Sequence, residues 1–150
     1  MRFSRVIASG GGVGFCPIAP GTAGSLVALE LGAGLLHLGR AALVCGIVLV
    51  IIAGIWAVRA EIAAGDAGWI VIDEVAGQWI ALLGLATPSL PGLVAAFLLF
   101  RLFDIAKPGP VGWMDRRHDA MGVMGDDVVA GALAAAVLLA LTALWPSLLG

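Results

Sequence analysis

Polar and helix-breaking residues divide the chain into apolar stretches of helix length. The cleanest apolar stretch, residues 41–58, carries no charge and is about as long as a helix needs to be to cross the hydrocarbon of a bilayer. Pro146 ends the last stretch. The pattern predicts an all-α fold, a compact and mostly membrane-embedded bundle in a single domain over residues 1–150. About five apolar helices are expected, over residues 26–38, 41–58, 70–86, 92–105 and 128–145.

The composition shows which solvent these helices meet. Of the 150 residues, 61% are hydrophobic and 12% are charged, and the mean hydropathy is +1.09. Soluble domains average about 25% charged residues, so lipid must form a large part of the surroundings. The alternative is a soluble helical protein whose apolar face is covered in a homo-oligomer. The net charge of −2 gives no reason to expect a nucleic acid partner.

The basic residues orient the predicted bundle. With five spans and a cytoplasmic N-terminus, seven of the eight lysines and arginines lie on the cytoplasmic side, and Arg40 alone lies on the other. This asymmetry is the one that the positive-inside rule describes. We therefore expect a multi-pass protein of a bacterial-type inner membrane, surrounded by membrane lipids.

The same orientation brings most of the unusual polar residues to the cytoplasmic face. Asp73 and Glu74 stand near the start of an apolar run, WIVIDEVAGQWIALL. Acidic residues within a membrane span are rare and usually functional. The competing interpretation is a pair of acids in the first turn of a helix, where the helix dipole stabilises their negative charge.

A second polar group ends the predicted helix 92–105. In FLLFRLFDIAKPGP, Arg101, Asp104 and Lys107 follow one another at three-residue steps, on one face of a helix. They are either an ion ladder at an interface or a carboxylate beside two cations that bind phosphate. Pro108 ends the helix because it disfavours helical backbone in the residue before it.

A third group of acids precedes the last apolar run. One Asp at that place could be an ordinary helix cap. Asp126 and Asp127 are adjacent, however, and Asp115 lies in the loop before them, so a cap does not account for all three. Mg²⁺ takes oxygen ligands and commonly binds through a few carboxylates and a substrate phosphate.

The Gly- and Pro-rich segment 1–24 supplies the last group of candidate site residues. Its run GFCPIAPGTAGSL contains too many helix breakers for a regular helix, so we expect an irregular loop or a re-entrant turn. Backbone N–H groups with Thr22 and Ser25, just before a helix, can bind an anion. The run is not a Walker loop, because no Lys follows Gly21. It is not a cysteine-phosphatase loop either, because the residue six after Cys16 is not Arg.

Together these residues place carboxylates, cations and a Gly/Thr/Ser loop around one pocket at the membrane surface. A metal can screen the charge of a phosphate and activate water, while cations stabilise the charge that develops. The pattern therefore predicts phosphoryl chemistry with Mg²⁺ as cofactor.

Four blocks resemble the phosphatidylglycerophosphatase A family, in its order and spacing. They are GVGFCPIAPGTAGSL (12–26), IDEVAGQWIAL (72–82), FRLFDIAKPGPVGWMDR (100–116) and GVMGDDVVAG (122–131). The resemblance covers essentially the whole chain. It implies a Mg²⁺-dependent enzyme that hydrolyses the terminal phosphate of phosphatidylglycerophosphate, giving phosphatidylglycerol and inorganic phosphate. Two positions depart from the family: Glu30 replaces a usual Pro, and Asp119-Ala120 replaces a usual Gly-Gly.

With the resemblance, the residues receive roles as hypotheses. The metal ligands are sought among Asp73, Glu74, Asp126, Asp127, Asp104 and Asp115. The substrate phosphate is assigned to Thr22, Ser25, Arg101, Lys107 and Arg116. The catalytic group is Asp73, Glu74, Asp104, Asp127 and Lys107.

Two questions stay open at this stage. The attacking group is either water or an Asp that forms an aspartyl phosphate. The chain lacks the DxDx[TV] signature of haloacid-dehalogenase enzymes, which favours water. The alternative function is a non-enzymatic membrane module or an ion or solute transporter that uses the same acids. A transporter should carry charges along the depth of its helices, whereas the charges here gather at one end.

Overall fold

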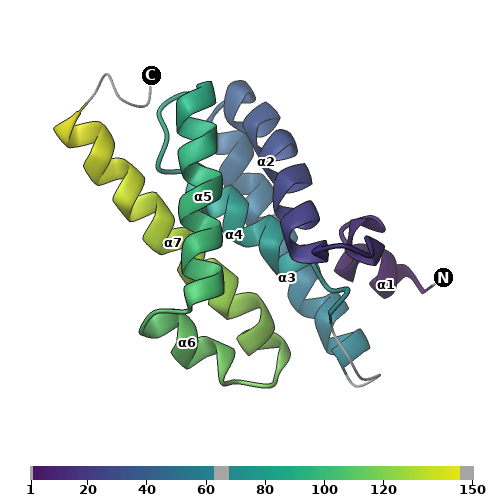
Figure 1. Cartoon of the computed structure of the whole chain (residues 1–150). Helices are drawn as coiled ribbons and strands as arrows, with labels where there is room; N and C mark the ends of the chain where they lie inside the picture. The colour runs from purple at the N-terminus through teal and green to yellow at the C-terminus, as the bar shows by residue number, and fades with distance from the viewer. Residues whose placement is uncertain (1, 63–67, 146–150) are drawn as a thin grey trace.

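The computed structural model describes residues 2–62 and 68–145, and within them every regular element is a helix (Figure 1). The five longest helices correspond to the five predicted apolar ones, so the all-α prediction is confirmed. In chain order the elements are α1 (Phe3–Ala8), the short 3-10 helix η1 (Val13–Phe15), α2 (Pro20–Leu38), α3 (Arg40–Glu61), α4 (Ile72–Leu82), α5 (Leu90–Ala106), α6 (Pro110–Asp115) and α7 (Ala120–Leu144).

The N-terminal segment is more regular than predicted. The expected loop over residues 1–24 holds α1, η1 and the start of α2, although the three glycines at residues 10–12 do have positive φ angles. Helix α2 begins at Pro20 because proline needs no N–H partner in a first turn and its φ angle suits a helix. Thr22 and Ser25 therefore project from a helix, and the prediction of a loop around them is wrong.

Helix α7 also begins earlier than predicted, and Asp119 caps it. The Asp119 side chain accepts a 2.8 Å hydrogen bond from the Gly122 N–H. The Arg117 guanidinium and this N–H lower the pKa of Asp119 to about 2. Asp126 and Asp127 lie in the second turn of α7, so the helix-cap interpretation is wrong for both. The expected long loop before α7 is interrupted by α6.

Helices α4 and α7 approach each other at glycines, and this is the most extensive helix contact in the described residues. A Cβ atom added at Gly131 would overlap the backbone oxygen of Gly77. One added at Gly77 would overlap the ring of Phe100 in α5 and the backbone oxygen of Asp127. Small residues let backbones come this close, as they do in membrane helix pairs.

Three helices, α2, α3 and α7, are long and apolar enough to cross a membrane. Helix α3 presents large apolar side chains outward; Leu49 is 68% exposed and Ile52 is 64% exposed. Lipid is the natural cover for such a surface. Helix α4 has 11 residues, so the predicted span over 70–86 is a shorter helix whose residues are mostly buried.

Arg40, the one basic residue expected on the far side, stabilises the end of α4. Its guanidinium donates to the backbone oxygens of Leu83, at 3.2 Å, and Leu85, at 2.8 Å. Carbonyls just past a helix end need such partners. Asp73 and Glu74 lie at the opposite end of the same helix, so the two kinds of charge are separated along α4.

Replacing Gly131 by Val should separate α4 from α7. The added side chain would overlap the α4 backbone, and overpacking of this kind costs about 1–3 kcal/mol. We expect a lower melting temperature by circular dichroism in detergent. Gly34→Ala is the control, because an added Cβ there meets nothing within 4 Å. Equal melting of Gly131→Val and the unsubstituted chain would contradict the close contact.

Candidate active site

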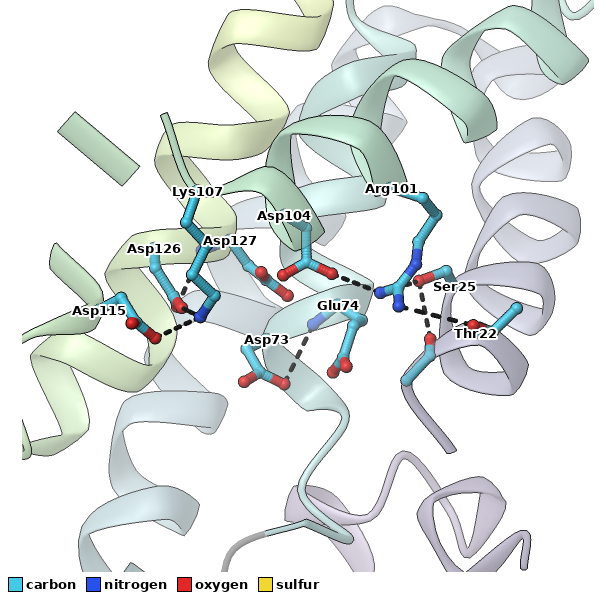
Figure 2. Close-up of polar contacts among 11 residues, drawn as sticks. Thr22, Ser25, Asp73, Glu74, Arg101, Asp104, Lys107, Asp115, Asp126 and Asp127 are labelled. Atoms are coloured by element: carbon cyan, nitrogen blue, oxygen red, sulfur yellow. Dashed lines mark hydrogen bonds and ion pairs between the residues drawn. The ribbon is translucent and has the colours of Figure 1, made fainter. Parts of the chain in front are cut away.

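Three carboxylates from α4 and α7 form the core of the site (Figure 2). Asp73 and Glu74 occupy the first turn of α4, and Asp127 faces them from α7. One oxygen from each lies within 4.8 Å of the other two. Asp127 is only 3% exposed, so negative charges are held together largely out of water. Such a group needs a compensating cation or proton, and its oxygens suit a hard divalent metal.

Arg101 borders this group on the side of α2 and α5. Its Nη1 atom lies 2.5 Å from Asp104 Oδ2 and 3.4 Å from Ser25 Oγ. Its Nη2 atom lies 3.5 Å from Thr22 Oγ1. The structure therefore brings the predicted anion-binding residues of α2 together with Arg101, as Figure 2 shows. Together they present one guanidinium and two hydroxyls next to the carboxylates.

Gly21 lets α2 pass close to Glu74. A Cβ atom added at Gly21 would overlap Glu74 Oε1, and it would lie 3.5 Å from Arg101 Nη1. Any larger residue would have to displace the carboxylate or the guanidinium. The sequence marks this position only as one glycine among 22, so its role in the site was missed.

Buried polar atoms without a hydrogen-bond partner gather at this place. In the part of the chain that the structure describes, they are Glu74 Oε2, Arg101 Nε and both amide atoms of Gln78. Gln78 follows Glu74 by one helical turn and shares its side of α4. Buried polar groups usually have partners. Their concentration here indicates that this region is built to hold a polar ligand.

Lys107 binds Asp115 and Asp126, the two acids of the predicted site that lie outside the groups described above. It follows α5 with a left-handed backbone, φ 45°, and its Nζ atom bonds Asp115 and, at 2.9 Å, Asp126. Burial lowers the pKa of Lys107, but the hydrogen bonds to both acids outweigh it, and the net pKa lies above its ordinary value. The alternative of an ion ladder with Arg101 and Asp104 therefore fails for Lys107, because the helix has ended and the side chain turns toward α6 and α7.

A polar cavity of about 390 Å³ opens beside these residues. Asp73, Asp115 and Asp126 line it together with Arg117 and His118. The last two were not among the predicted site residues, because only the path of the α6–α7 connection brings them to this wall.

Arg116, which was predicted to bind phosphate, is exposed at the end of α6. Among the described residues, no hydrogen bond or ion pair joins it to the carboxylates. The neighbouring Arg117 pairs with Asp119 at 2.9 Å, so the two adjacent arginines have different surroundings.

A comparison with known families identifies the family of this chain. Residues 6–142 match the family described as Phosphatidylglycerophosphatase A. The chain belongs to this family. The match spans every residue of the site, from Thr22 in α2 to Asp127 in α7.

Curated relatives extend the match over most of the chain. Phosphatidylglycerophosphatase A of Escherichia coli K12 is 37% identical over 95% of this chain and 85% of its own length. The Haemophilus influenzae protein of the same name is 37% identical over 91% of this chain and 87% of its own length. A Bacteroides thetaiotaomicron protein is described as a candidate phosphatidylinositol-3-phosphatase. It is 44% identical over 84% of this chain and 85% of its own length. No solved structure matches.

Removing Lys107 tests the link between the acids of α6 and α7. Lys107→Met leaves Asp126, which is 7% exposed, without its cation, and an unpaired buried charge is strongly unfavourable. We expect a loss of about 1–3 kcal/mol in the free energy of unfolding, measured by denaturant titration in detergent. Arg117→Met is the control, because it removes an exposed ion pair that contributes little. Equal losses in both variants would refute the structural role of Lys107.

Proposed function

We propose that this chain is a metal-assisted lipid phosphatase that hydrolyses the terminal phosphate of phosphatidylglycerophosphate. The observation that carries the proposal is the carboxylate group of Asp73, Glu74 and Asp127 beside Arg101, at one end of a bundle with three helices able to cross a membrane. Membership of the phosphatidylglycerophosphatase A family supports the choice of substrate. The products would be phosphatidylglycerol and inorganic phosphate.

The donor set fits Mg²⁺, which prefers carboxylate oxygens and keeps room for water and substrate phosphate. Asp73, Glu74 and Asp127 would hold it, since their oxygens already converge and Glu74 Oε2 has no other partner. Asp104 lies next to this group, whereas Asp115 and Asp126 bond Lys107. When bound, the metal would screen the phosphate charge and lower the pKa of water.

The cations of the site would hold the phosphoryl group. Arg101 can donate to phosphate oxygens in a bidentate manner, with Thr22 and Ser25 beside it. Lys107 stays protonated because its pKa is raised, so it acts as a hydrogen-bond donor and not as a base. Arg116 is exposed and would meet the substrate only at the rim.

Two routes for the attack fit this arrangement. In one, water attacks phosphorus, the bond from phosphorus to the glycerol oxygen breaks, and the leaving oxygen takes up a proton. In the other, an Asp carboxylate attacks first and water then hydrolyses the aspartyl phosphate. Both require the phosphate to lie between the carboxylates and Arg101.

The position of the charges favours an enzyme over a transporter. Asp73 and Glu74 begin α4, and Asp127 lies near the start of α7. Within α7, the residues beyond Asp127 carry no charge up to its end at Leu144. A charge distribution confined to one end suits chemistry at the membrane surface. By the positive-inside rule, we place this end on the cytoplasmic face of a bacterial-type inner membrane.

Asp73→Asn and Asp127→Asn should each lower phosphate release from phosphatidylglycerophosphate by at least about 100-fold. Each substitution removes one negative charge from the group proposed to hold the metal. The assay is phosphate release from mixed micelles with Mg²⁺. Asp119→Asn is the matched control, because Asn is also a good helix cap and Asp119 lies at the exposed start of α7. Turnover at the unsubstituted rate in both site variants would refute the assignment.

Chelation tests the metal directly. EDTA should abolish phosphate release, and added Mg²⁺ should restore it, because carboxylates alone would repel the phosphate. Full activity after exhaustive dialysis against EDTA would rule out a metal-assisted reaction while leaving the lipid phosphatase activity itself standing.

A further inference from the structure

A second cavity lies on the other side of the first turn of α4. Its volume is about 450 Å³, which is in the range of small-molecule sites. Helices α2, α3 and α4 form its walls, and α1 with the following glycines closes one end. Every residue that lines it is either glycine or hydrophobic, so its walls select for an apolar ligand.

The cavity is elongated along α2. Gly24, Ala28 and Leu31 line it at steps of four and three residues, one face of the helix, and they span about 10 Å at 1.5 Å per residue. Among the lining residues of α4, Trp79 lies farthest along the helix from Asp73 and Glu74. Its ring lies against Gly46 of α3, and its Nε1 donates a 2.7 Å hydrogen bond to the Ala28 oxygen. The Trp79 ring is therefore held in place at the cavity wall.

The mouth of the cavity faces the lipid. Leu31 of α2 is 59% exposed and Leu49 of α3 is 68% exposed, and both line the cavity. Both helices are long and apolar enough to cross a membrane. In a bilayer the opening is therefore met by hydrocarbon chains and not by water.

The cavity adjoins the carboxylate site across the first turn of α4. Ile72 and Val75 line it, while Asp73 and Glu74 between them belong to the carboxylate group with Asp127. Helix α2 also borders both the carboxylate group and the cavity, through two glycines that lie one turn apart. Its Gly21 contacts Glu74, and the space beside its Gly24 is bounded by Val71 of the cavity wall. A ligand with a phosphate at the carboxylates can thus reach the cavity with an attached chain.

We propose that this cavity binds one acyl chain of the lipid substrate while the phosphate lies at the carboxylates. The inference rests on the proposed function. A chain that comes from lipid or detergent gains no free energy of transfer from water, so its binding would rest on van der Waals packing against the apolar walls. The acyl chain would therefore contribute to substrate affinity.

Ala53→Phe tests this by filling the cavity from α3, where Ala53 lines it and is half-buried. We expect a rise of about tenfold in KM for diacyl phosphatidylglycerophosphate in mixed micelles, with kcat unchanged. The KM for the deacylated, water-soluble head group should stay the same. Ile52→Phe is the control, since it places the same phenyl side chain one residue away, on the lipid-facing surface and outside the cavity.

Each outcome separates the two proposals. An unchanged KM for the diacyl substrate in Ala53→Phe, or equal rises for both substrates, would overturn the acyl-chain site. If the unsubstituted chain with Mg²⁺ hydrolyses neither substrate, the proposed function fails instead.

Photo-labelling covers the case in which Ala53→Phe does not fold. Phosphatidylglycerol with a diazirine at mid-chain should label Leu31, Val50 or Ala53 of the unsubstituted protein. An excess of unlabelled diacyl substrate should suppress this labelling. Labelling that is uniform over the lipid-facing helices, or that the substrate does not suppress, would overturn the proposal.

Discussion

The close contact of α4 and α7 at Gly77 and Gly131 is the constraint on which the site depends. Asp73 and Glu74 lie one turn before Gly77, and Asp127 lies one turn before Gly131. When the two glycines bring the backbones together, the acids one turn away must also meet. The position of the carboxylate group therefore follows from a packing contact between uncharged residues, and a larger side chain there would part the acids.

Charges are balanced locally around this contact. Arg101 pairs with Asp104, and Lys107 bonds Asp115 and Asp126. Asp73, Glu74 and Asp127 have no such cation among the described residues. Three carboxylates kept from water with no ion pair of their own are unfavourable, and Arg101 beside them already pairs with Asp104; this is the physical reason to propose a metal there. The neighbouring ion pairs offset part of the charge of Asp104, Asp115 and Asp126.

Helix α4 separates two environments over very few residues. Its first turn directs Asp73 and Glu74 toward the polar site, while Ile72 and Val75 line an apolar cavity that opens to lipid. A phosphorylated lipid has the same two parts, a charged head and apolar chains. A helix too short to span the bilayer is suited to this position, because its charged end can lie at the membrane surface while its remaining residues are buried among longer helices.

The sequence by itself determined the helical class, the approximate location of the five apolar helices and the acids that would meet at one end. These follow from local hydrophobicity, from helix-breaking residues and from the cost of charge in lipid. Only the tertiary structure decided the approach of Gly21 in α2 to Glu74, the direction of Lys107 after α5 and the exposure of Arg116. Each depends on residues far away in the chain, since a helix end or a long side chain takes the partner that packing brings near it. The same holds for the carboxylate group, whose members come from two helices joined by a contact that no local pattern specifies.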